Sequence, residues 1–271
     1  MRLLSPRSPV PHRLVPALVL ALALLPAASA LADAPALSPE QLQQLLKTLD
    51  ERSNTPTDYR AQMTAFVKRE TGTAVRELQL FRRDREERLV VLFTAPKTEA
   101  GKGYLHEEKN LWSYDPNVGR WERRTERESI GGTESRRSDF DQTQYATGFD
   151  ATYEGTDKLG NLTAHRIALK VKEGRDVAFP LLKVWVDVAS GNQLKREEYA
   201  LSGKLLRTAL SSGWKKVAVP GRQEPFWYPE EIRLYDELHK GNSTAFKCKG
   251  VDMRPLPNNL FTKAWLESKS R

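Results

Sequence analysis

The residue types that most often carry chemistry are scattered in this sequence. His106, His165 and His239 lie far apart along the chain. Asp139 and Asp141 offer two carboxylates, but positions i and i+2 do not share one helix face. Motifs for a nucleophilic serine, a phosphate-binding loop, a dinucleotide site or a zinc hydrolase do not occur. We therefore expect no catalytic residues, no metal and no cofactor. An exported hydrolase would require clustered histidines or a buried carboxylate pair in a pocket.

The thiol chemistry is equally limited. Cys248 is the single cysteine, so an internal disulfide is impossible. One of the four histidines lies in the extreme N-terminus, so the remaining histidines and the cysteine are too few ligands for a Cys/His zinc site. Lys247 and Lys249 flank this cysteine in an alternating pattern. We expect a thiol that points into the core, whereas an exposed thiol between two lysines would have a lowered pKa.

The charge pattern argues against a nucleic-acid partner. The chain has 271 residues, with 43 Lys and Arg against 35 Asp and Glu. Basic runs such as Arg123-Arg124 lie beside acids such as Glu122 and Glu126, so the signs are mixed. A nucleic-acid site would need a coherent basic stripe. Solvated surface is the favoured interpretation, and weak attraction to anionic lipid headgroups is the alternative.

The first thirty residues resemble a secretory signal peptide. Arg2, Arg7 and Arg13 precede an apolar run over residues 14–25, and Ala28-Ser29-Ala30 follows as a cleavage site. The run is short for a transmembrane span, although an uncleaved N-terminal anchor is the alternative. We expect cleavage near Ala30 and export of the remaining chain.

A helix is predicted over residues 38–52. Ser38, Pro39 and Gln41 supply an N-cap, a proline at the first helical position and a capping-box glutamine. Asn54-Thr55-Pro56 ends it. One apolar stripe follows the helical period and could cover a core or act as a lid over a ligand cavity: Leu42, Leu45, Leu46 and Leu49.

From Tyr59 the apolar period changes from helical to two, which predicts strands. Turn residues such as Asp115-Pro116-Asn117 separate the candidates, so antiparallel hairpins are expected. Roughly a dozen strands would make a sheet that curls or closes. The expected strands cover residues 59–68, 75–83, 88–94, 103–108, 110–114, 120–126, 151–155, 161–171, 182–188, 194–200, 205–211, 214–219, 226–234 and 243–251.

The strands are apolar on one face only, so that face needs a cover. Leu182, Val184 and Val186 alternate with Lys183 and Asp187. Three short helical segments are available as covers, over residues 38–52, 139–145 and 257–267. The expected fold is therefore α+β and mainly antiparallel β, an incomplete, half-open barrel whose helices cover its concave apolar face. Without a linker or a repeat, residues 31–271 are expected to form a single domain.

Large aromatic side chains cluster near two turns, in Leu111-Trp112-Ser113-Tyr114-Asp115-Pro116 and Pro225-Phe226-Trp227-Tyr228-Pro229. They can fill the core and the rim of the sheet, or line a pocket for an apolar ligand. The candidate cavity or rim residues are Trp112, Tyr114, Phe140, Trp185 and Trp227.

The order of motifs resembles a known family. Gly101-Lys102-Gly103-Tyr104-Leu105 is followed by Leu111 to Pro116, then by Arg137-Ser138-Asp139-Phe140-Asp141, then by Glu198-Tyr199 and Gly203 to Arg207. This order is similar to that of the LolA-like outer-membrane lipoprotein-sorting proteins, over nearly the whole mature chain. The chain departs from the family pattern by having Arg136-Arg137 before Ser138 and no acid from Gln142 to Tyr145.

The resemblance implies a non-enzymatic periplasmic carrier that takes acyl chains of a lipoprotein or lipid into a hydrophobic cavity and moves them towards the outer membrane. Burial of apolar surface would supply the affinity, so no covalent chemistry is needed. The partners it implies are an acylated lipoprotein or lipid, an inner-membrane transporter and an outer-membrane acceptor, and the carrier is expected to be a monomer. The alternative is a protein-binding module, or an accessory partner of an envelope transporter, that holds no lipid.

Overall fold

The computed structural model describes residues 36–55, 57–107, 110–125 and 128–270. The expected signal peptide, residues 1–30, lies outside these ranges. The described residues form one compact unit. Among the helices within the described ranges, none is both long and apolar enough to cross a membrane.

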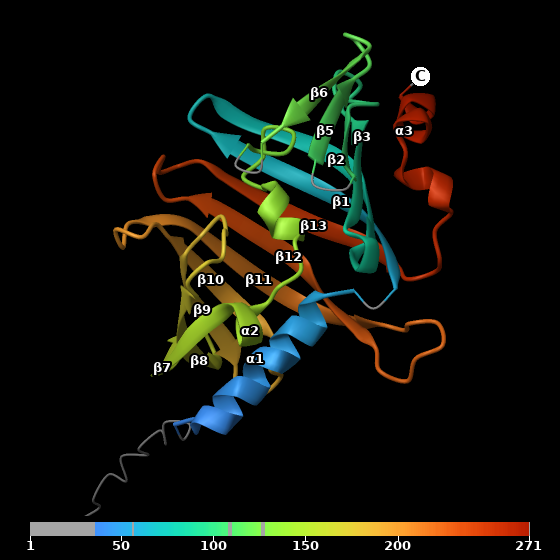
Figure 1. Cartoon of the computed structure of the whole chain (residues 1–271). Coiled ribbons are helices and arrows are strands. Elements are labelled where there is room, and N and C mark those ends of the chain that lie inside the picture. The colour runs from blue at the N-terminus through green and yellow to red at the C-terminus, as the bar shows by residue number, and fades with distance from the viewer. Residues whose placement is uncertain (1–35, 56, 108–109, 126–127, 271) are drawn as a thin grey trace, which may run out of the picture. The chain divides into compact units, whose positions relative to one another are not determined.

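In the described residues, thirteen strands form one antiparallel sheet in the order β6-β5-β4-β3-β2-β1-β13-β12-β11-β10-β9-β8-β7 (Figure 1). The edge strands β6 and β7 do not pair with each other, so the barrel stays open and the expected fold class is confirmed. The strands are β1 (Asp58–Arg69), β2 (Gly72–Arg83), β3 (Arg88–Ala95), β4 (Gly103–Glu107), β5 (Asn110–Asp115), β6 (Arg120–Arg124), β7 (Phe149–Leu159), β8 (Leu162–Val171), β9 (Leu181–Asp187), β10 (Gln193–Tyr199), β11 (Leu205–Val217), β12 (Phe226–Asp236) and β13 (Ser243–Asp252).

Two details of the strand prediction are wrong. The segments 205–211 and 214–219 are not two strands, because β11 runs continuously through Gly213. This glycine has a φ of +66°, and a Cβ there would lie 2.9 Å from the Cβ of Glu230 on β12, so only glycine fits the close approach. The strand expected at 151–155 is in fact the longer β7, which is bent at a register shift near Gly155.

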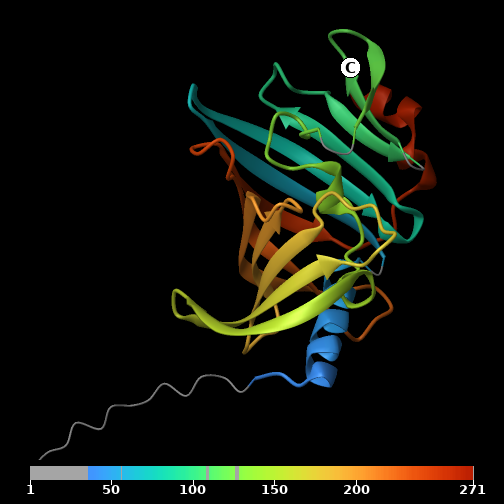
Figure 2. The same ribbon diagram turned by 60° about the vertical axis from the view of Figure 1, so that its left-hand side comes forward.

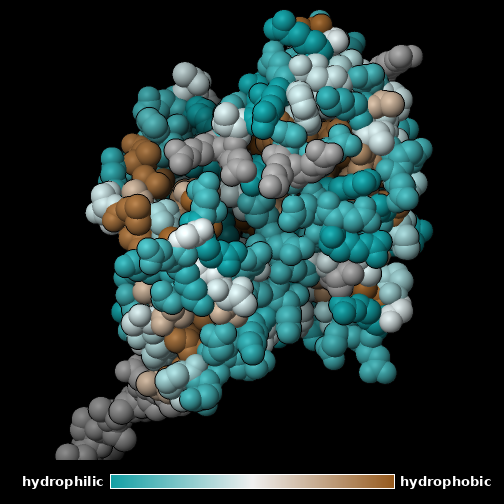
Figure 3. Space-filling view, viewed as in Figure 1, coloured by the Kyte–Doolittle hydropathy of each residue, from teal (hydrophilic) through white to brown (hydrophobic). Residues whose placement is uncertain are grey.

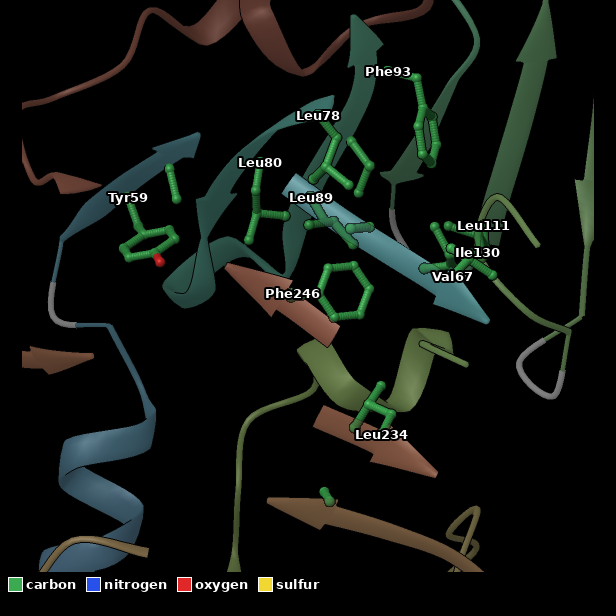
Figure 4. Packing of buried hydrophobic residues seen from close by; sticks show 14 of the residues in the cluster. Tyr59, Val67, Leu78, Leu80, Leu89, Phe93, Leu111, Ile130, Leu234 and Phe246 are labelled. Atoms are coloured by element: carbon green, nitrogen blue, oxygen red, sulfur yellow. The ribbon is translucent and has the colours of Figure 1, made fainter. Parts of the chain in front are cut away.

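Side chains alternate between an inner and an outer face of the sheet. On β3, Leu89, Val91 and Phe93 belong to the largest core cluster, on the inner face. Val90 and Leu92 point to the other face. Figure 4 shows the inner cluster, in which side chains of β1, β2, β3, β12 and β13 converge. On β1, Tyr59, Ala61, Ala65 and Val67 belong to the same inner cluster, which confirms the alternation predicted from Tyr59 to Val67.

The C-terminal segment covers the outer face, not the concave one that was expected. Its 3-10 turn η3 (Asn258–Phe261) and helix α3 (Lys263–Lys269) pack Leu260, Phe261 and Leu266 against Val90, Leu92 and Leu105. Figures 1 and 2 both place α3 beside the β3–β5 hairpins. The segment is anchored by Arg83, which donates to the Leu256 carbonyl at 2.6 Å and is itself paired with Asp58. An apolar stripe alone does not tell which face of a sheet it covers.

The first helix, α1 (Pro39–Ser53), begins as predicted. Ser38 accepts from the Gln41 amide, and the Gln41 side chain accepts from the Ser38 amide. Leu42, Leu46 and Leu49 are buried, and Leu45 packs partly, against Val184, Val186 and their neighbours on the inner face of β8 and β9. This helix covers the second half of the sheet.

We expect Leu46→Ala to reduce the free energy of unfolding by about 3 kcal/mol, because the Leu46 side chain is only 1% exposed and its removal leaves a cavity. Leu45→Ala on the same stripe should cost less than half as much, since Leu45 is only partly buried. Urea titration measures both, with an unchanged slope showing that the native state is intact. Equal losses for the two variants would contradict the packing of α1.

Candidate functional site

The connection from β6 to β7 crosses the inner face of the sheet and forms a plug, residues 136–148. It contains the 3-10 turn η2 (Arg137–Phe140) and the short helix α2 (Tyr145–Gly148) (Figure 1). Asp50 of α1 accepts from the Tyr145 amide at 2.8 Å and from the Ala146 amide at 2.9 Å, so it caps α2. Asn54 exchanges two hydrogen bonds with the Thr143 backbone. Helix α1 and the plug are therefore joined into one cover.

A buried ion network fixes the plug to the sheet. Arg207 of β11 donates to both oxygens of Glu198 on β10, at 2.5 and 2.9 Å, and to both oxygens of Asp139 in the plug, one of them at 2.8 Å. Arg196 of β10 pairs with the same two acids, at 3.2 Å to Asp139 and 2.7 Å to Glu198. The Arg207 and Glu198 side chains are 2% and 1% exposed. Two guanidiniums thus neutralise two carboxylates in the interior.

The two arginines of this network keep the Asp139 carboxylate ionised. Burial by itself would raise the pKa of Asp139, but the charges of Arg207 and Arg196 and the hydrogen bond from Arg207 outweigh burial and lower that pKa below its usual value. A general acid needs a raised pKa near the working pH. The ionised Asp139 therefore acts as a structural anion. Within the described ranges no group of three His, Cys, Asp or Glu residues could hold a metal ion.

Two adjoining cavities are lined by residues of the plug. One has a volume of about 240 Å³ and a mainly apolar lining of Leu78, Leu80, Val91, Phe93 and other inner-face residues. The second, the polar cavity, has a volume of about 440 Å³. Its lining combines apolar residues such as Phe149 and Leu182 with arginines, acids and amides from the plug, the 175–179 loop, β10 and the β2–β3 connection. The face shown in Figure 3 is mostly hydrophilic, with small hydrophobic groups between the polar side chains. An apolar chamber beside a polar one suits a ligand with an apolar and a polar end.

The structure brings only part of the candidate aromatic set to these cavities. Phe140 lines both, and Trp227 of β12 lines the apolar one. Trp112 lies on the outer face, where Nζ of Lys263 on α3 lies 3.7 Å from the centroid of the Trp112 ring. Tyr114 stacks with Trp121 beside the C-terminal helix and lines a third pocket and neither of the two cavities.

Trp185 also points away from the cavities. It packs against Leu194 and Ala164, and its indole nitrogen donates to Asp157 at 2.7 Å. Its neighbours Val184 and Val186 face the inner side, so the period of two sends Trp185 outward. The residue Cys248 is half-buried against the inner cluster, and burial raises the pKa of its thiol.

His106 gives the site rim a pH dependence. Its Nδ1 lies 2.5 Å from the Glu87 carbonyl oxygen and its Nε2 lies 3.4 Å from Nη1 of Arg137. Burial, with a further contribution from the Arg137 charge, lowers the pKa of His106 below 6.5. Below pH 6.5 the unfolded chain therefore binds a proton at His106 more readily than the folded protein does. The free energy of unfolding is highest above pH 6.5 and decreases as the pH falls towards the lowered pKa. Burial lowers the pKa of His165 as well, which acts in the same direction.

We accordingly expect the urea midpoint of the wild type to fall between pH 7.5 and pH 5.5, and His106→Gln to make that fall smaller. His239→Gln replaces a histidine that is 72% exposed and pairs with Asp236, and it is the comparison variant for a histidine outside the cavities. Equilibrium urea titrations at the two pH values decide between the variants. The same fall in wild type and His106→Gln would refute the assignment.

Comparison with known proteins identifies the relatives of this fold. A family model described as "Uncharacterized protein" matches residues 85–268, more than half of the chain. The chain belongs to this family. A search of curated proteins finds no match.

Solved structures connect this family with the LolA-like fold. A domain described as an outer membrane lipoprotein-sorting protein, from Vibrio parahaemolyticus, is 18% identical with a TM-score of 0.69 and covers 83% of this chain and 97% of its own. A LolA superfamily protein from Nitrosomonas europaea is 20% identical with a TM-score of 0.64, covering 82% and 98%. A DUF1329 family protein from Desulfovibrio piger is 14% identical with a TM-score of 0.69, covering 83% and 97%. The resemblance inferred from the motifs is confirmed for the fold.

Proposed function

We propose that this protein is a non-enzymatic carrier that holds an acyl chain of a lipoprotein or lipid in the apolar cavity beneath the plug. The observation that carries the proposal is an apolar chamber on the inner face of an open LolA-like sheet, beside a polar chamber. Each acyl methylene moved from water into such a chamber gains about 0.8 kcal/mol, which is enough to hold a chain without chemistry. Phe140 and Trp227 are the cavity residues that we retain from the sequence prediction.

The carrier would work in the periplasm after removal of the signal peptide near Ala30. It would receive its cargo at an inner-membrane transporter and release it to an outer-membrane acceptor. Helix α1 and the plug form its cover, and the hydrogen bonds of Asp50 and Asn54 would make the two move together. The apolar stripe Leu42, Leu45, Leu46 and Leu49 would then be the underside of a lid.

The test is to purify the protein from the periplasm under native conditions, extract it with organic solvent and identify bound lipid by mass spectrometry. Delipidated protein is then titrated with a fluorescent acyl probe. The proposal expects stoichiometric lipid and saturable binding of the probe. The absence of both would sink the carrier function and favour the alternative, a protein-binding module or transporter accessory without lipid cargo.

A further inference from the structure

The two cavities meet at a junction in the plug. Because they share lining residues, the apolar cavity and the polar cavity are direct neighbours. The shared residues are Arg82, Phe140, Asp141, Thr143, Tyr145 and Arg196.

Buried polar atoms at this junction lack a partner within the described residues. Oγ of Ser138, Oγ1 of Thr143 and Nε of Arg196 are each buried and make no hydrogen bond. Such groups are rare in folded proteins, since burial removes their bonds to water. Ser138 lines the polar cavity, and the other two line both cavities. Three unpartnered hydrogen-bonding groups thus belong to residues that line the junction.

The fold holds these donors in place. The Thr143 backbone is fixed by two hydrogen bonds to the Asn54 side chain, at 3.0 and 3.2 Å. The terminal nitrogens of Arg196 are taken by Asp139, Glu198 and the Tyr145 hydroxyl, which leaves Nε without a bond. Donors held in this way favour a ligand whose acceptor lies at a fixed point.

The charges around the polar cavity indicate which acceptor fits. Five arginines and five carboxylates line it, so the cavity has no net charge with which to attract a free anion. The arginines are Arg82, Arg88, Arg137, Arg175 and Arg196, and the acids are Asp84, Glu87, Asp141, Asp176 and Glu198. A neutral acceptor, such as a carbonyl oxygen, meets the donors without adding charge.

We infer that the junction binds the carbonyl oxygen of the ester that joins an acyl chain to its headgroup, and this inference rests on the proposed function. The acyl chain lies in the apolar cavity and the headgroup lies in the polar one. Thr143 Oγ1 and Arg196 Nε donate to the carbonyl oxygen, and Ser138 donates on the headgroup side. The site thereby selects acylated amphiphiles over plain hydrocarbon and over ether lipids.

The test compares 1-palmitoyl-lysophosphatidylcholine with its 1-hexadecyl ether analogue, which lacks only the ester carbonyl. Both displace a fluorescent fatty-acid probe below their micelle concentrations. The ester should bind about fivefold to tenfold more tightly, the effect of one or two buried hydrogen bonds. Thr143→Val should abolish most of this preference while retaining binding of the ether.

Thr64→Val is the matched control. Thr64 has an unpartnered buried hydroxyl too, but it lies on β1 and lines neither cavity. This variant should keep the ester preference of the wild type. Ser138→Ala is the second variant and should also weaken the preference for the ester. It allows the same comparison if Thr143→Val does not fold.

The outcomes separate the two proposals. Equal binding of ester and ether by the wild type overturns the ester site and leaves the carrier function standing. Displacement of the lysolipid by inorganic phosphate also overturns the ester site, because it assigns recognition to the phosphate. Failure of both lysolipids and of the probe to bind overturns the carrier function and the ester site together.

Discussion

Replacing Arg207 with alanine is expected to reduce the free energy of unfolding by about 3–5 kcal/mol, because the buried Asp139 and Glu198 carboxylates then share only Arg196. The substitution also removes the hydrogen bond from Arg207 to the Glu134 carbonyl, which anchors the residues that lead into the plug. For a domain of this size, the loss corresponds to a fall in Tm of about 6–20 °C. Thermal unfolding followed by circular dichroism, together with urea titration, measures it.

Arg233→Ala is the matched control for this prediction. Arg233 lies on the neighbouring strand β12 and pairs with Glu231, but its side chain is 54% exposed. Solvent screens such a pair, so we expect a loss below about 1 kcal/mol. A loss for Arg207→Ala as small as that of the control would show that the network does not stabilise the plug. Arg207→Lys keeps one positive charge but loses the forked geometry of the guanidinium. Its loss of unfolding free energy should therefore lie between those of Arg207→Ala and Arg233→Ala.

The network also shows where sequence reasoning reached its limit. The family motifs containing Asp139 and Arg207 were recognised from their order, and the structure brings these two residues into contact across 68 positions of the chain. Arg196 was not singled out, because a single arginine in an alternating strand carries no signal of its pairing. Local patterns predict elements, whereas contacts between distant residues depend on the order of strands in the sheet, which the sequence does not display.

The same distinction explains the aromatic candidates. Period-two alternation correctly indicated that Tyr59, Ala61 and Val67 share a face, because that pattern is local. It could not tell which face of another strand is the inner one. Leu111 points inward, so Trp112 points outward, and a shift of one residue would reverse them. Phe140 lies on the plug, and its place at the cavities depends on the connection that crosses the sheet.

Because Phe140 lines the cavities and Trp112 lies on the outer face, an acidic substitution at each position should affect acyl binding differently. Phe140→Asp should weaken binding of a fluorescent acyl probe at least about tenfold, because it removes an aromatic wall shared by both cavities and places a charge beside the acyl chain. Trp112→Asp makes a comparable change from aromatic to acidic on the outer face and should leave the affinity for the probe near that of the wild type. Fluorescence titration of the two variants, after thermal unfolding has shown that both are folded, makes the comparison.

A variant that adds no charge separates loss of the chamber from electrostatic repulsion. Ala209 of β11 is buried and lines the apolar cavity, so Ala209→Trp should fill the space that the acyl chain needs. Overpacking costs about 1–3 kcal/mol of stability, which the remaining core can absorb. If Ala209→Trp and Phe140→Asp both lose the probe and Trp112→Asp retains it, the acyl chain lies beneath the plug. If Trp112→Asp loses the probe and the two cavity variants keep it, the chain binds on the outer face instead, and the apolar cavity is only a packing defect of the open sheet.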